Sequence, residues 1–73
     1  MLFNEAELKS IVSFLERIIQ LHKGIGLYLN DRPSTPFQIA YECVREGAVY
    51  MPDYVMDEDG MLQELRYQRI RQF

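Results

Sequence analysis

A group of carboxylates lies in the C-terminal third of this 73-residue chain: Asp53, Asp57, Glu58 and Asp59. Aspartates two apart before a glycine, here Gly60, resemble part of a calcium-binding loop, which needs oxygen ligands at alternating positions and a glutamate at its twelfth residue. The first acid and the spacing differ from that loop, and Gln63 and Glu64 do not supply the missing ligand. The sequence therefore predicts an acidic, solvated turn and no metal site.

Covalent catalysis would need a nucleophile and a base, and the chain has one cysteine and one histidine, Cys43 and His22. They are far apart in the sequence, so we do not expect them to converge in one pocket. A single cysteine forms no internal disulfide, which suits a reducing cytoplasm. We interpret Cys43 as a buried structural thiol and His22 as a packing residue, and we predict that the protein is not an enzyme.

The charge and the motifs also bear on cofactors, nucleic acids and membranes. Gly24 and Gly26 precede a predicted strand, whereas a dinucleotide-binding motif has its glycines after a strand, so we predict no cofactor.

The net charge of −3 at pH 7 is not the basic footprint of a nucleic-acid binder. Arg66, Arg69 and Arg71 form a local basic cluster, which we interpret as a solvated chain end. No apolar run approaches the roughly 20 residues of a membrane span, so we expect a soluble, cytoplasmic protein.

Residues 4–23 are predicted to form an amphipathic helix, because their apolar side chains recur with a period of 3.6 residues. Asn4 is the expected N-cap, and the helix is expected to end near Lys23 and Gly24. The apolar side fills about half of the helix circumference, which is wider than a coiled-coil seam. Two or more other elements, or a second chain, must cover it. This side consists of Leu8, Ile11, Val12, Phe14, Leu15, Ile18, Ile19, Leu21 and His22.

The middle of the chain predicts a short extended segment, a turn and a second helix. Apolar residues alternate over 25–29, which favours a short strand, with a loop as the alternative. Residues 30–34 have the composition of a turn. Thr35, Pro36 and Gln38 then form a capping box with proline at the first helical position, and the helix is expected to run to about Glu46. Its apolar stripe is expected to contain Phe37, Ala40, Tyr41 and Val44, widened by Ile39 and Cys43.

The C-terminal third favours a β-hairpin, with a third helix over 61–72 as the alternative. Residues 49–56 are rich in strand formers, and Pro52 confines that strand to an edge or a bulge. Residues 57–60 resemble a three-residue hairpin loop closed by a left-handed glycine. If Asp57 pairs with Met61, Met51 lies opposite Tyr67. The residues expected to share one face are then Val49, Met51, Val55, Leu65 and Tyr67.

The order of these elements resembles a winged-helix module, with the stretch from Phe37 through Gly47 as recognition helix and the hairpin as wing. The resemblance covers about half of the chain. Residues 30–34 leave little room for the helix that should come before a recognition helix. Glu42, Glu46 and the acidic turn would also repel DNA phosphates. On such a scaffold we would expect protein binding rather than DNA binding.

Taken together, these patterns predict one α+β domain over residues 1–73, with two amphipathic helices packed on a C-terminal β-hairpin and a short third strand over 25–29 as an option. A three-helix bundle is the alternative. The excess of methionine and tyrosine and the acidic balance favour a non-enzymatic protein-interaction module, a small regulator or inhibitor that docks on a larger protein such as a nucleic-acid-processing enzyme.

Two other functions stay open: a winged-helix-like DNA-binding regulator, and a homodimeric structural or adaptor protein that associates through the helix over 4–23. For the favoured function, aromatic and methionine side chains would anchor the partner, with charges at the rim. The expected protein-binding residues are Tyr50, Tyr54, Met56, Asp57, Glu58 and Asp59.

Overall fold

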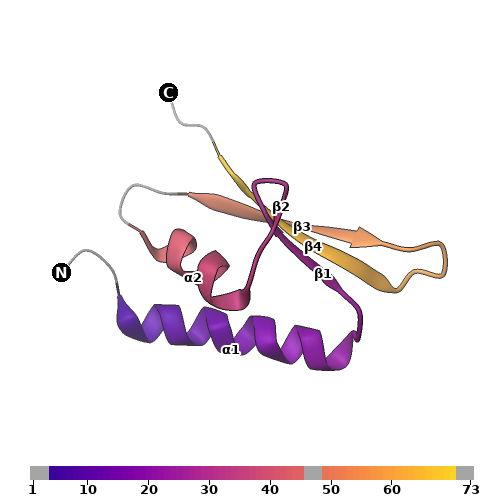
Figure 1. The fold of residues 1–73 in the computed structure, drawn as a ribbon, viewed down its shortest axis with the longest axis horizontal. Helices are drawn as coiled ribbons and strands as arrows, with labels where there is room; N and C mark the ends of the chain where they lie inside the picture. The colour runs from indigo at the N-terminus through magenta and orange to yellow at the C-terminus, as the bar shows by residue number, and fades with distance from the viewer. Residues whose placement is uncertain (1–3, 46–48, 71–73) are drawn as a thin grey trace.

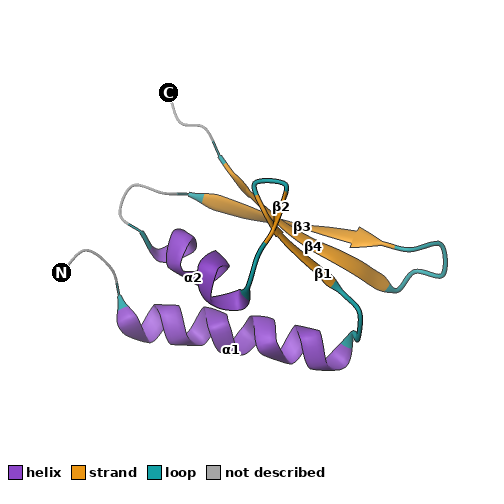
Figure 2. Ribbon diagram, viewed as in Figure 1, coloured by secondary structure: helices purple, strands orange, loops and turns teal. Residues whose placement is uncertain are grey.

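The computed structural model describes residues 4–45 and 49–70, which form two helices and a four-stranded sheet. Along the chain, the elements are α1 (Glu5–Leu21), β1 (Gly26–Leu29), β2 (Arg32–Pro33), α2 (Pro36–Val44), β3 (Tyr50–Met56) and β4 (Leu62–Arg69) (Figure 1). The strand order is β2-β1-β4-β3, with β1 parallel to β4 and the other neighbours antiparallel. Both helices lie on one side of the sheet (Figure 2). The predicted α+β class, the C-terminal hairpin and the third strand are confirmed, and the three-helix alternative is wrong.

Side-chain caps fix where both helices begin. The Asn4 Oδ1 atom accepts hydrogen bonds from the amides of Ala6 and Glu7, at 2.9 and 3.2 Å. At α2 the capping box is complete, because Thr35 Oγ1 accepts from the Gln38 amide while Gln38 Oε1 accepts from the Thr35 amide. Such caps satisfy amides that have no partner within the helix. Both helix starts are where the sequence predicts them.

Both helices end earlier than expected. The last residue of α1 is Leu21, and Gly24 follows in the left-handed conformation with φ of +86°. The last residue of α2 is Val44, because Arg45 is already extended. The predicted end near Glu46 and Gly47 lies outside the described residues.

A tight turn joins β1 to β2, and the sequence predicted the turn but not β2. Asn30 and Asp31 both have positive φ, 51° and 69°, as in the two-residue type I′ turns that join antiparallel strands. Asn30 also ties this turn to the rest of the sheet, because its Oδ1 accepts from the Arg69 amide at 3.1 Å and its Nδ2 donates to the Tyr50 hydroxyl at 3.3 Å. Since this strand pair occupies the place where a winged-helix module needs a helix, the chain does not adopt that arrangement.

The predicted hairpin register holds at the loop and fails beyond it. Asp57 pairs with Met61 as expected, since the Asp57 amide donates to the Met61 carbonyl at 2.8 Å. The register then shifts, with Met56 opposite Leu62 but Val55 opposite Glu64, so Gln63 is an extra residue in β4. Such a bulge displaces every later pair by one residue and exchanges the two faces of β3 relative to β4.

Because of this bulge, Pro52 rather than Met51 lies opposite Tyr67. Leu65 and Tyr67 are buried on the helix side of the sheet, as predicted. On β3, however, Tyr50, Pro52, Tyr54 and Met56 point to that side. Val49, Met51 and Val55 point to the other side, so the expectation that these three share a face with Leu65 and Tyr67 is wrong.

The core lies between the helices and the sheet. Its fully buried side chains are Leu15 of α1, Ile39 of α2 and Leu65 of β4, and Leu27 and Tyr67 complete the cluster. A second cluster joins the two helices through Leu8, Ala40 and Val44. Of the wide apolar side of α1, Leu8 and Leu15 are thus buried by other elements of the same chain, whereas Phe14 and Leu21 are 44% and 70% exposed.

Candidate functional site

In the loop at the end of the β3–β4 hairpin, one carboxylate holds the backbone in place through hydrogen bonds, and two others are exposed charges. Asp57 Oδ1 accepts from the amides of Asp59 and Met61, at 2.8 and 2.9 Å, and the Gly60 amide donates to the Asp57 carbonyl at 3.1 Å. Gly60 has φ of +80°, the left-handed conformation that the sequence predicts there. Asp57 therefore shapes the loop, while Glu58 and Asp59 are the exposed charges of the tip.

Two apolar side chains lie beside these charges. Tyr54 is 47% exposed and Met56 is 54% exposed, although both point to the side of the sheet that carries the helices. Both lie on β3, which is an edge strand of the sheet, and the loop end of the hairpin extends past the helices (Figure 1). A shallow hollow of about 420 Å³ lies here, lined by Met56, Asp57, Glu58, Asp59 and Gln63. We call Tyr54, Met56, Gln63 and the three acids the tip surface.

Tyr50, which the sequence grouped with Tyr54 and Met56, is not part of the tip surface. It is half-buried and packs against the main core. Its hydroxyl donates to Glu42 Oε1 at 3.4 Å and accepts from Asn30. Tyr50 thus connects α2 to the β1–β2 turn at the opposite end of β3. Of the six predicted contact residues, the structure groups four around the hollow at the tip: Met56, Asp57, Glu58 and Asp59. Asp57 also holds the loop, and Tyr54 lies on the same face of β3 as Met56.

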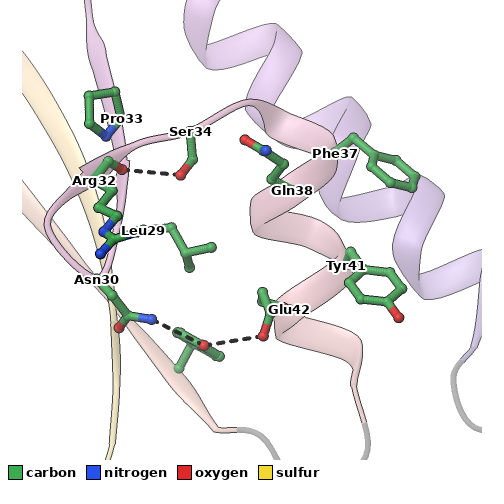
Figure 3. Close-up of a pocket in the computed structure, with 10 residues that line it drawn as sticks. Leu29, Asn30, Arg32, Pro33, Ser34, Phe37, Gln38, Tyr41 and Glu42 are labelled. Carbon is green, nitrogen blue, oxygen red and sulfur yellow. Dashed lines mark hydrogen bonds between the residues drawn. The ribbon is translucent and has the colours of Figure 1, made fainter.

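A hollow of about 670 Å³ lies between α2 and the β1–β2 hairpin (Figure 3). Most of its polar groups are already paired within the chain. Ser34 Oγ donates to the Arg32 carbonyl at 3.1 Å, and Glu42 accepts from Arg45 at 3.1 Å. Gln38 completes the cap of α2. These bonds are local, and the turn is linked to α2 through Tyr50, which binds both Asn30 and Glu42.

The face of the sheet away from the helices carries a paired arginine. The Arg66 guanidinium stacks on the Tyr28 ring at 4.2 Å from its centre and binds Glu64 at 2.8 Å and Asp31 at 3.2 Å. The hydrogen bond with Glu64 raises the Arg66 pKa further. Arg71 lies outside the described residues. In the described part of the C-terminal arginine cluster, Arg66 is thus neutralised by two acids.

The Cys43 thiol of α2 is half-buried and packs against the main core cluster. Burial, with smaller contributions from the charges of Glu42 and Glu7, raises its pKa from 9.0 to about 11. His22 is the C-cap residue of α1.

Alkylation of Cys43 is expected to be about a hundredfold slower in the folded protein than in the urea-unfolded chain at pH 8, because two pKa units lower the reactive thiolate by that factor. The raised pKa keeps the thiol protonated, so the difference should shrink as the pH approaches 11. Iodoacetamide labelling followed by mass spectrometry measures both rates. Equal rates at pH 8 would show that the thiol is not shielded.

Sequence reasoning missed one exposed aromatic pair. Phe37 and Tyr41 were expected in the buried stripe of α2, but Phe37 is 57% exposed and its ring stacks on Tyr41 at 6.3 Å between centres. Figure 3 shows both rings pointing away from the hollow beside the β1–β2 turn. Their spacing of four residues signals a shared helix face, but the sequence does not say whether that face is covered.

Comparisons of the chain with protein-family models, curated proteins and solved structures found no match. In residues 4–45 and 49–70, no three histidine, cysteine or acidic side chains are grouped so that they could hold a metal ion. Neither described helix has the length and apolar character needed to cross a membrane. The function is therefore argued from the surfaces of this molecule.

Proposed function

We propose that this chain is a non-enzymatic protein-interaction module, a small acidic regulator that docks on a basic surface of a larger protein. The observation that carries the proposal is the tip surface, where exposed Met56 lies beside Glu58 and Asp59 and exposed Tyr54 lies two residues away on the same face of β3. Aromatic and methionine side chains are enriched as buried anchors of interfaces, and charges around them steer association. The tip surface combines both.

The charge of the tip indicates the kind of partner. Glu58 and Asp59 are exposed, and the chain as a whole carries a net charge of −3. Opposite charge raises the encounter rate with a basic surface. Enzymes that act on nucleic acids carry such surfaces, so an inhibitor or regulator of a nucleic-acid-processing enzyme is the specific form that we favour. The single free thiol suits a reducing cytoplasm, which we propose as the compartment.

The test uses matched pairs of substitutions on the same hairpin. Glu58→Lys and Met56→Ala alter the tip surface, whereas Asp53→Lys and Met51→Ala make the same changes on the other face of β3. Met51 is a close control because it is 58% exposed, compared with 54% for Met56. Asp57 is left unchanged because its carboxylate shapes the loop.

We expect Glu58→Lys and Met56→Ala each to weaken binding of the partner about tenfold or more, while both control variants bind like the unmodified chain. Affinity capture from a host lysate with mass spectrometry identifies the partner, and titration with the purified partner measures the affinity. Equal binding by the tip variants and their controls would contradict the proposal.

A further inference from the structure

A second apolar surface lies where α1 and α2 meet, and Phe37 is its most exposed side chain, at 57%. A hollow of about 400 Å³ between the helices has Leu8 and Val12 on one side and Phe37 on the other. Tyr41 extends this apolar surface by stacking on Phe37. The rim residues on α1 are Glu5, Lys9 and Ser13. We call these seven residues the seam surface, and it lies on a different side of the molecule from the hairpin tip (Figure 1).

The charged residues of α1 beside this seam are arranged so that they can pair with the same residues of a second, antiparallel copy. Glu5 and Lys9 line the hollow, and Glu16 and Gln20 line the next hollow along α1, beside Pro36. When two copies of α1 approach antiparallel, centred between residues 12 and 13, Lys9 of each copy faces Glu16 of the other. Glu5 then faces the uncharged Gln20. This arrangement forms two ion pairs and brings no like charges directly opposite each other.

A two-fold dimer needs a surface of this kind, because the same patch must be complementary to its own copy after rotation. The apolar centre would bring together Val12 and Phe37 of both copies, with the ion pairs at the rim, which is the usual layout of an interface. We propose that the seam surface is a homodimer interface, in which a second copy of this chain covers Phe37.

The sheet edges do not offer a competing route to association. Ser34 donates its amide to Leu27, so the neighbouring Pro33 turns its nitrogen away from β1. Val49 accepts from Ile70, so by alternation Pro52 turns its nitrogen away from β4. Each edge strand therefore has a proline, which has no N–H, at an outward-facing position, a feature that opposes strand addition. Strand addition is therefore not a route by which two copies would associate.

The first part of the test asks whether the seam holds the two copies together. The mass in solution is measured by light scattering and by sedimentation up to several hundred micromolar protein. We expect a mass that approaches twice the 8.7 kDa of one chain. Phe37→Glu should weaken association more than about a hundredfold, because it places two carboxylates in the apolar centre. Met51→Glu is the matched control, since Met51 and Phe37 are 58% and 57% exposed, and it should leave the dimer intact.

The second part asks whether the copies are antiparallel as proposed. Lys9→Glu and Glu16→Lys should each weaken the dimer about tenfold, because each turns two attractive pairs into repulsive ones. The double variant restores opposite charges across the two-fold axis and should recover most of the loss. Circular dichroism checks that every variant is folded.

A monomeric mass at all concentrations would overturn the inference, as would equal effects of Phe37→Glu and Met51→Glu. Failure of the double variant to recover would overturn the antiparallel arrangement. These outcomes are independent of the proposed function, because Phe37, Lys9 and Glu16 lie outside the tip surface.

Discussion

Replacing Leu65 with alanine is expected to lower the free energy of unfolding by about 3 kcal/mol. Leu65 is fully buried in β4, which lies between β1 and β3, and it belongs to the core cluster with Leu15 and Ile39. The loss combines the transfer of the side chain with the cavity that it leaves. A chain of this length has a total stability on the order of 5–10 kcal/mol, so this one change removes a large part of it.

Leu62→Ala is the matched control on the same strand. Leu62 is half-buried, opposite Met56 on the part of the hairpin that extends past the helices. Its truncation is expected to change the stability by about 1 kcal/mol or less. Urea unfolding followed by circular dichroism measures both variants. A loss at Leu62 as large as that at Leu65 would show that the end of the hairpin is covered, and the tip surface would lose its basis.

Replacing Asn30 with alanine is expected to lower the stability by about 2 kcal/mol, from two causes that a second variant separates. Alanine loses the hydrogen bonds to the Arg69 amide and the Tyr50 hydroxyl. It also tolerates the φ of 51° less well than asparagine does. Asn30→Gly loses the same bonds but accepts the positive φ, so it should recover about half of the loss.

Asp31→Asn serves as the control for this turn. It keeps a side chain that tolerates positive φ and removes a carboxylate whose pair with Arg66 is largely exposed. Exposed ion pairs contribute little, so its effect should stay within about 0.5 kcal/mol. Thermal and urea unfolding give all three values. If Asn30→Gly is as unstable as Asn30→Ala, the conformational part of the explanation is wrong.

Several features of the fold were predictable because residues close together in the sequence produce them. The caps of Asn4 and Thr35 are hydrogen bonds between residues no more than three positions apart, and the structure contains the caps that the sequence patterns predict. The loop over 57–60 is local in the same way, with one carboxylate and one left-handed glycine. Such contacts depend little on the rest of the chain, so composition and spacing were enough to predict them.

The candidate site was only partly predictable, because its faces depend on contacts between distant residues. In the sequence, nothing distinguishes Gln63 from an ordinary polar strand residue. In the structure it forms a bulge, and this bulge reverses which face of β3 packs toward the core. Tyr50 and Tyr54 are similar in sequence context, but one binds Glu42 and Asn30 while the other lies exposed beside the tip. Phe37 has the spacing of a core residue and is exposed because α2 turns its other side toward α1 and the sheet.

The residues alone thus determined the two capped helices and the acidic loop, since these depend on hydrogen bonds and periodicities that span a few positions, whereas the choice of a hairpin over a third helix was only favoured. The packing of α1, α2 and the sheet decided which apolar side chains are buried and which form the tip surface and the seam surface. Apolar periodicity shows which side chains of a helix or strand favour burial. The element that covers them comes from elsewhere in the chain, so which of them are actually buried is decided only when the elements pack together.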